Sequence, residues 1–198
     1  KAPIVFGFVL VFAFLLLLVT FRSLVVAAKA IVLNLLSVGA AYGVLVAVFQ
    51  WGWGESLLGF TSNGGIAQWL PIFMFVILFG LSMDYHVFIL SRVREAYDRG
   101  MSTADAVEYG ISTTAGVVSS AALVMVGAFA VFALMPILDM KEMGIGLAAA
   151  VLIDATIVRA VLLPATMKLL GDWNWYLPNW LQWLPRLEHD PTPVPAAA

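Results

Sequence analysis

The sequence contains no cysteine and few charged side chains. Without cysteine among its 198 residues, it can form neither a disulfide bond nor a thiolate metal site. Charged residues make up 11% of the chain, against about 25% in a soluble domain. The net charge is only −2, which lacks the basic excess that nucleic-acid binding requires. We therefore expect no nucleic-acid partner and no ordinary soluble domain.

Long apolar runs take the place of the charges. Hydrophobic residues make up 63% of the sequence, and the mean hydropathy is +1.00. A helix of about 20 residues crosses a hydrocarbon core of roughly 30 Å. Five runs approach or exceed this length, at about residues 4–21, 24–49, 70–91, 113–135 and 143–170. Because lipid offers no hydrogen bonds to the backbone, these spans must be helices. The sequence predicts an all-α, multi-pass membrane protein surrounded by lipid.

The segment between the third and fourth spans is the one long charged stretch. Residues 92–110 carry three arginines, and Ser102 precedes Asp105 in the spacing of a capping box. Apolar residues then recur at helical spacing. We interpret this segment as a short amphipathic helix on the cytoplasmic membrane surface.

The distribution of lysine and arginine predicts the orientation. Seven of these residues fall on one side of a five-span topology: Arg22, Lys29, Arg92, Arg94, Arg99, Lys168 and Arg186. Only two fall on the other side. Cytoplasmic segments carry the excess of positive charge, so the N-terminus is predicted to be extracytoplasmic and the C-terminus cytoplasmic. Residues 173–198 are predicted to form an aromatic interfacial segment and then, from Glu188, a disordered tail. The first span begins directly after Lys1, which suggests a fragment of a larger protein.

Asp84 lies inside the third span, where a carboxylate costs roughly 2.5–3.5 kcal/mol. Such a residue marks an ion or proton path with a partner on another helix. Gly80 is four residues earlier on the same face and would let a helix approach. Ser119 and Ser120 of the fourth span lie at a similar depth, so they are candidate partners of Asp84, with ordinary helix packing as the alternative. Tyr85 is about 100° further around the helix, so its hydroxyl should reach a different helix.

Two further charges lie inside the fifth span. Asp154 and Arg159 are five residues apart, which places them about 140° apart on an α-helix. They are therefore not a regular intrahelical pair, although a long arginine can still bridge or reach the interface. Both should face the bundle interior. The role of His86 stays open between a packed or solvent-facing ring and a group that titrates near neutral pH.

Small residues recur at four-residue spacing in two spans. Gly39 and Gly43 lie in the second span, and Gly116 and Ser120 lie in the fourth. Such pairs let transmembrane helices approach closely, and we expect helix contacts at both.

Three stretches together carry a family resemblance. They are Gly-Leu-Ser-Met-Asp-Tyr at 80–85 leading into Leu-Ser-Arg-Val-Arg-Glu at 90–95, Ile-Asp-Ala-Thr-Ile-Val-Arg at 153–159, and Leu-Pro-Ala at 163–165. In this setting the chain resembles the MmpL (mycobacterial membrane protein large) family of resistance–nodulation–division (RND) exporters, over residues 1–172. Members of that family have twelve spans in two halves, each with a large porter domain after its first span. The resemblance implies that this chain is spans eight to twelve, the C-terminal transmembrane half.

The resemblance also implies a mechanism. Asp84 and Tyr85 match the proton relay of span ten, which faces an equivalent Asp-Tyr pair in the N-terminal half. Asp154 and Arg159 match the charged pair of span twelve. The implied activity is export of lipids or other hydrophobic molecules across the bacterial inner membrane, driven by the proton-motive force. Protons are the coupling ion, no other cofactor is implied, and the protein is not an enzyme. The N-terminal half and the porter domains are the implied partners.

Two other classes compete with this reading. One is a membrane module that assembles other proteins without transport. The other is an intramembrane aspartyl protease that uses Asp84 and Asp154 as a dyad, since two carboxylates can share a proton. The Gly-x-Gly-Asp motif known from such proteases is missing, because Ser82-Met83 precedes Asp84. Arg159 would also keep a nearby carboxylate ionised.

Overall fold

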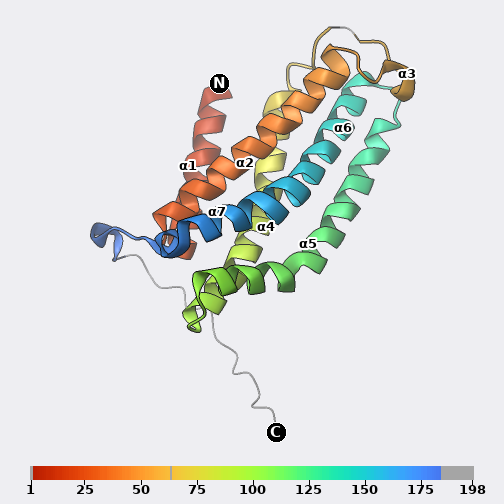
Figure 1. The fold of residues 1–198 in the computed structure, drawn as a ribbon. Helices are drawn as coiled ribbons and strands as arrows, with labels where there is room; N and C mark the ends of the chain where they lie inside the picture. The colour runs from red at the N-terminus through yellow and green to blue at the C-terminus, as the bar shows by residue number, and fades with distance from the viewer. Residues whose placement is uncertain (1, 63, 184–198) are drawn as a thin grey trace.

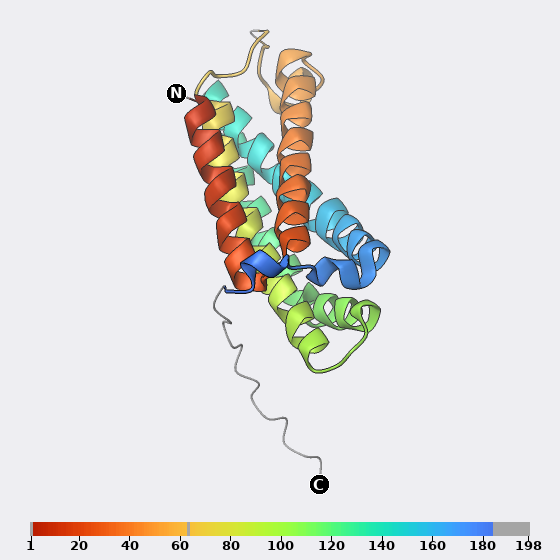
Figure 2. The ribbon, with the colours of Figure 1, turned by 90° about the vertical axis from the view of Figure 1, so that its left-hand side faces the viewer.

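A computed structural model describes residues 2–62 and 64–183. Its described part is helical, without strands, and five helices are long and apolar enough to cross a membrane. These helical stretches are Ala2–Phe21, Leu24–Gln50, Leu70–Asp98, Thr103–Ala133 and Leu138–Trp175. They pack as a bundle whose helices run between an upper end, with the N-terminus, and a lower end (Figures 1 and 2). The predicted all-α membrane fold is confirmed.

The first two helices form an antiparallel pair joined by a tight turn. α1 (Ala2–Phe21) is followed by Arg22, whose φ of 49° makes the turn. The Ser23 side chain then caps α2 (Leu24–Leu45) by accepting a hydrogen bond from the Val26 amide at 3.1 Å. A π-helical segment, η1 (Val46–Gln50), completes this span. Only four residues of α1 are buried, all in its second half. α1 is therefore a peripheral helix, as expected of one that is apolar on all sides.

The fifth span lies at the centre of the bundle and contains three segments. α6 (Leu138–Ile153) packs against α2, α4 (Leu70–Asp98) and α5 (Thr103–Ala133). A π-helical segment, η2 (Asp154–Leu162), follows and leads into α7 (Leu163–Leu170). Figure 1 shows these segments descending obliquely beside α2. The three helices α2, α4 and α5 thus surround the junction of α6 and η2.

The closest helix contacts occur at glycines other than the predicted ones. A Cβ atom on Gly144 would lie 2.7 Å from the Ala133 amide nitrogen, and one on Gly110 would lie 2.9 Å from that of Val93. In contrast, no described side chain or neighbouring helix lies within 4 Å of such a position at Gly39, Gly43 or Gly116. These three glycines therefore make no close helix contact within the described part of the chain.

The separate amphipathic helix predicted for residues 92–110 does not form. α4 continues to Asp98 and α5 begins at Thr103, so the segment is divided between two spans. Three ion pairs stabilise the part of α4 that follows its apolar residues, and the two partners of each pair lie about one helical turn apart. The pairs are Arg92–Glu95, Arg94–Asp98 and Arg99–Glu95. Ser102 caps α5 by accepting from the Asp105 amide at 3.2 Å, as the capping pattern predicted. Figure 1 shows the first turns of α5 crossing the lower end before the helix turns upward.

Polar contacts tie the chain down at both ends of the bundle. At the upper end, the loop containing α3 (Glu55–Leu58) is held by the start of α6, where Glu142 accepts from the Ala67 amide at 3.0 Å. At the lower end, η3 (Gly171–Trp175) and η4 (Asn179–Leu181) pass beneath α2. There the buried Asn174 bonds both Ser23 and Lys29. The tail predicted to be disordered from Glu188 falls outside the described residues.

Candidate functional site

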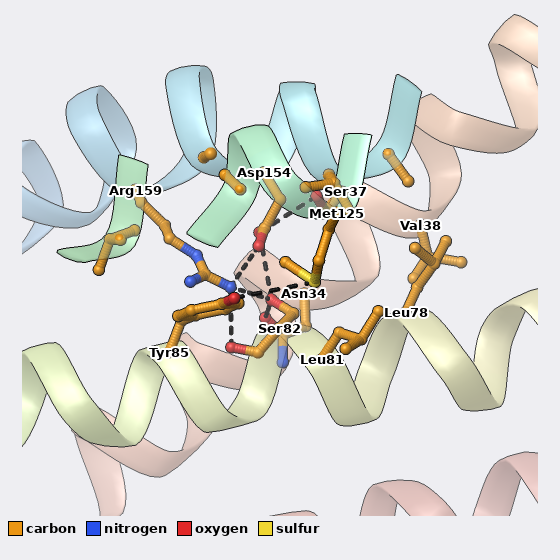
Figure 3. A pocket seen from close by; sticks show the side chains of 15 residues that line it. Asn34, Ser37, Val38, Leu78, Leu81, Ser82, Tyr85, Met125, Asp154 and Arg159 are labelled. Carbon is orange, nitrogen blue, oxygen red and sulfur yellow. Dashed lines mark hydrogen bonds and ion pairs between the residues drawn. The ribbon is translucent and has the colours of Figure 1, made fainter. Parts of the chain in front are cut away.

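A cluster of buried polar side chains lies where α2, α4 and η2 meet. Its members are Asn34 and Ser37 of α2, Ser82 of α4, and Asp154 and Arg159 of η2. Figure 3 shows these side chains pointing toward one another across the space between the helices. As predicted, both charges of the fifth span face the interior. Sequence reasoning did not place the three uncharged residues in the site, although Asn34 and Ser37 share one face of an otherwise apolar helix.

Asp154 and Arg159 form a direct ion pair within one helix. Arg159 Nη2 donates to Asp154 Oδ2, and only 4% and 11% of the two side chains are exposed. In a π-helix the hydrogen bonds run from residue i to i+5, so residues five apart lie nearly above one another. The expectation that they would not form a regular intrahelical pair is therefore wrong, because it assumed α-helical geometry.

Neighbouring helices complete the environment of the pair. Asp154 Oδ1 accepts from Ser37 at 3.2 Å and from Ser82 at 3.1 Å. Arg159 Nη2 also donates to the Ser82 carbonyl oxygen at 2.9 Å. The Ser82 hydroxyl lies 2.6 Å from Asn34 Oδ1. A buried ion pair is stable only when such additional hydrogen bonds satisfy its remaining atoms, and most of them are present here.

Tyr85 connects this pair to the next helix. Its ring lies beneath the Arg159 guanidinium, whose carbon is 4.4 Å from the ring centroid, within the range of a cation–π contact. Its hydroxyl points to the Met125 sulfur of α5 at 3.7 Å. The prediction that this hydroxyl reaches another helix is confirmed.

Asp84 lies outside this cluster. Its side chain is exposed and makes no hydrogen bond or ion pair with the described residues. Gly80 is on the same exposed face, and no described side chain or neighbouring helix lies within 4 Å of its Cβ position. Ser119 and Ser120 are exposed on α5, and Ser120 donates to the Val117 carbonyl of its own helix at 3.0 Å. The structure joins neither serine to Asp84 by a hydrogen bond, so their pairing stays a prediction.

A small cavity opens beside the ion pair. Its volume is about 20 Å³, and Asn34, Tyr85, Met125, Asp154 and Arg159 are among the residues that line it (Figure 3). This volume suffices for about one water molecule. Asn34 Nδ2 and Arg159 Nε are buried at this site without a hydrogen-bond partner among the described residues. Both are donors, so the cavity combines room for water with groups that bind its oxygen.

The arrangement excludes a carboxylate dyad in this conformation. Asp154 is buried against Arg159, whereas Asp84 is exposed and unpaired within the described chain. A protease dyad requires two carboxylates close enough to share one proton. The structure therefore gives no support to the protease alternative.

Five apolar helices around a buried carboxylate–guanidinium pair define a multi-pass membrane protein with an intramembrane charged site. Within that class the chain can be placed further. It matches the MMPL family over residues 3–195, and it belongs to that family.

Similar proteins come from mycobacteria and beyond. The chain is 48% identical to the mycolic acid-containing lipids exporter MmpL11 of Mycolicibacterium smegmatis, over 90% of this chain and 19% of that protein. It is 46% identical to the heme uptake protein MmpL11 of Mycobacterium tuberculosis, over 98% of this chain and 20% of that protein. It is 38% identical to the trehalose monomycolate exporter MmpL3 of M. smegmatis, over 92% of this chain and 18% of that protein. These relatives are named as transport proteins rather than enzymes, and the chain spans about a fifth of their length.

Proposed function

We propose that this chain is the C-terminal transmembrane bundle, spans eight to twelve, of a proton-driven exporter of lipids or other hydrophobic molecules. Membership of the MMPL family supports this proposal, as do the names of the two exporters among its relatives. The observation that carries it is the contrast between two carboxylates. Asp154 is buried and accepts hydrogen bonds from three side chains, whereas Asp84 faces outward from a membrane-spanning helix with no hydrogen-bond or ion-pair partner among the described residues.

The outward position of Asp84 implies a second half of the transporter. A carboxylate facing lipid costs roughly 2.5–3.5 kcal/mol, so another polar segment covers this face in the whole protein. The N-terminal half, with its own Asp-Tyr pair, is that segment in our proposal. Gly80 and the two serines, Ser119 and Ser120, lie on uncovered surfaces that such a segment would reach.

The relay works by changing the surroundings of Asp84. Burial in an apolar environment favours the protonated form of a carboxyl group, and a nearby cation favours the ionised form. When the two halves move, Asp84 passes between these environments and binds or releases a proton. Tyr85 follows Asp84 in the sequence and its ring contacts Arg159, so in our proposal it connects this exchange to the fixed charges of Asp154 and Arg159. Proton movement thereby drives rocking of one half against the other.

The orientation in the membrane follows from the two ends of the bundle. The lower end carries the arginines of the α1–α2 turn and of the α4–α5 connection, whereas Lys141 lies at the upper end. Exposed tryptophans occur near both ends, among them Trp51 and Trp173, as expected at membrane–water interfaces. We assign the lower end to the cytoplasm and the protein to the bacterial inner membrane.

The test is the substitution Asp84→Asn in the full-length protein. We expect proton-coupled lipid transport in proteoliposomes to be lost, because asparagine cannot bind and release a proton. Membrane insertion and thermal unfolding should stay unchanged, since Asp84 is exposed and forms no hydrogen bond or ion pair with the described residues of this bundle. Asp98→Asn, at the exposed end of the same helix, is the matched control and should transport normally. Wild-type transport by Asp84→Asn would contradict the relay and favour the assembly-module alternative.

A further inference from the structure

His86 is fully buried, and only one nitrogen of its ring has a hydrogen-bond partner. Nδ1 lies 3.2 Å from the Ser82 carbonyl oxygen, and no described residue bonds Nε2. A carbonyl oxygen can only accept, so Nδ1 carries the hydrogen and Nε2 is the bare, basic nitrogen. A buried acceptor without a partner is destabilising, because it has lost its hydrogen bonds to water. An apolar residue would fill this space without that cost, so packing alone does not account for a histidine here.

The helix register places this ring on the cytoplasmic side of the Asp154–Arg159 pair. α2 and α4 run antiparallel (Figure 1), and they are joined where Ser82 meets Asn34 at 2.6 Å. One helical turn, 3.6 residues, leads from Ser82 to His86 in the direction of the lower end. On α2, Lys29 lies five residues before Asn34, which is a little more than one turn further toward the same end. His86 also lies about 200° around α4 from Asp84, on the inner face of the helix.

Three charged groups act on the imidazole. Asp154 and Arg159 of η2 both bond Ser82, whose carbonyl oxygen also bonds His86, and Lys29 of α2 has the weakest influence of the three. The Arg159 guanidinium even shares the Ser82 carbonyl oxygen with His86 Nδ1. Burial and the two cations disfavour a proton on the ring, whereas Asp154 attracts it. A proton bound here would therefore be released readily.

Polar groups continue from His86 to the lower end of the bundle. Lys29 Nζ donates to Asn174 Oδ1 at 2.8 Å, and no described carboxylate forms an ion pair with this lysine. Asn174 is itself fully buried within η3. A line of polar residues thus descends through an otherwise apolar bundle: Asp154, Ser82, His86, Lys29 and Asn174. Intramembrane ionisable residues arranged in this way mark proton paths.

We propose that His86 is a proton-binding residue of the transport cycle, on the cytoplasmic side of the Asp154–Arg159 pair; this inference rests on the proposed function. In the cycle, Nε2 accepts from water a proton that the relay has released. The imidazolium then returns the same proton from Nε2 to water beside Lys29 and Asn174, and the neutral ring is regenerated. Nδ1–H stays on the Ser82 carbonyl oxygen throughout, so the ring does not need to turn over.

The first experiment compares His86→Gln and His86→Phe in the full-length protein in liposomes, at a series of cytoplasmic-side pH values. We expect lipid transport to fall by at least about tenfold in both, because a positioned proton-transfer group contributes on the order of a hundredfold. The residual transport should lose the wild-type dependence on cytoplasmic pH. Phenylalanine fills the space of the ring, so wild-type transport with an unchanged pH profile in His86→Phe would overturn the proposal.

The second experiment observes the ring directly in the wild-type protein. Nitrogen NMR of histidine-labelled, full-length wild type gives the protonation state, and the His86 signal is identified by its loss in His86→Gln. His189→Gln is the matched control, because it removes the other histidine of this sequence. We expect the Nδ1–H form to become doubly protonated as the pH falls. A ring that stays neutral throughout the pH range of transport would overturn the proposal.

Failure of the proposed function can be told apart from failure of this inference. If Asp84→Asn transported normally, the proposed relay would fail, while the NMR measurement would still decide the role of His86.

Discussion

Ser82 joins four of the buried polar residues although it carries no charge. Its hydroxyl lies within hydrogen-bond distance of Asn34 and Asp154, and its carbonyl oxygen accepts from Arg159 and faces His86. A hydroxyl has one hydrogen to donate, so it cannot donate to Asn34 and Asp154 together. Turning the Asn34 amide by 180° would let Nδ2 donate to Ser82 and leave the hydroxyl hydrogen for Asp154. That arrangement also provides a partner for the otherwise unbonded Asn34 nitrogen.

At the residue scale, Arg159→Gln should strongly destabilise the full-length protein. The substitution leaves Asp154 buried without its counterion, and removing one partner of a buried pair costs about 3–5 kcal/mol. The midpoint of thermal unfolding in detergent should fall clearly below that of the wild type. Arg94→Gln is the matched control, because its partner Asp98 is 56% exposed and exposed pairs contribute only about 0–1 kcal/mol. Equal midpoints for the two variants would contradict a buried, stabilising pair.

At the scale of elements, the π-helical segment determines how the charged pair is made. η2 spans nine residues within an otherwise α-helical span, and π-helical turns are rare and frequently mark functional sites. The wider turn brings Arg159 back to Asp154 while its guanidinium still covers the Tyr85 ring. With α-helical spacing, the two side chains would point about 140° apart.

Close contact between α5 and α6 depends on a single glycine. A methyl group on Gly144 would lie 2.7 Å from both the Ala133 nitrogen and the Phe129 carbonyl oxygen, which are backbone atoms. We expect Gly144→Ala to lower the unfolding free energy by about 1–3 kcal/mol, because backbone cannot give way as a side chain can. Gly7→Ala on peripheral α1 is the matched control, since no described side chain or neighbouring helix lies within 4 Å of that position. Thermal unfolding of the full-length protein measures both, and an unchanged midpoint in Gly144→Ala would argue against this contact.

At the scale of the whole molecule, the bundle leaves polar and small residues uncovered at membrane depth. Asp84 and Gly80 on α4, Gly116 and Ser120 on α5, and Gly39 on α2 are all exposed. Helices facing only lipid have no need of such residues, because lipid contact favours large apolar side chains. These uncovered surfaces fit the proposed contact with an N-terminal half.

We predict that this chain reconstituted alone does not transport, because Asp84 lacks the partner against which it would exchange protons. Joining the missing half should restore activity. Co-expression of the two parts as separate chains, followed by a proteoliposome transport assay, tests this expectation. The matched control replaces the missing half by one with asparagine in its Asp-Tyr pair. Transport by this chain alone would contradict the prediction.

Composition and pattern by themselves determined the number of membrane spans, the all-α fold class and the interior position of Asp154 and Arg159. The length and hydropathy of the apolar runs suffice to predict the number of spans and the fold class. The cost of exposing Asp154 and Arg159 to lipid predicts that both charges face the interior. The same reasoning identified the cap at Ser102 and the reach of Tyr85 to another helix. These features depend on local properties of the chain, which a sequence shows directly.

Only the tertiary structure decided how the site is assembled. Nothing in the spacing of Asp154 and Arg159 distinguishes an α-helix from a π-helix, since packing against neighbouring helices selects the register. Ser82 and Asn34 are 48 residues apart in the sequence, and they enter the site because α4 and α2 meet beside the charged pair. The same packing makes Gly144 indispensable to the bundle and leaves Gly39 free. Such outcomes depend on which surfaces meet, and that is a property of the folded bundle rather than of any one segment.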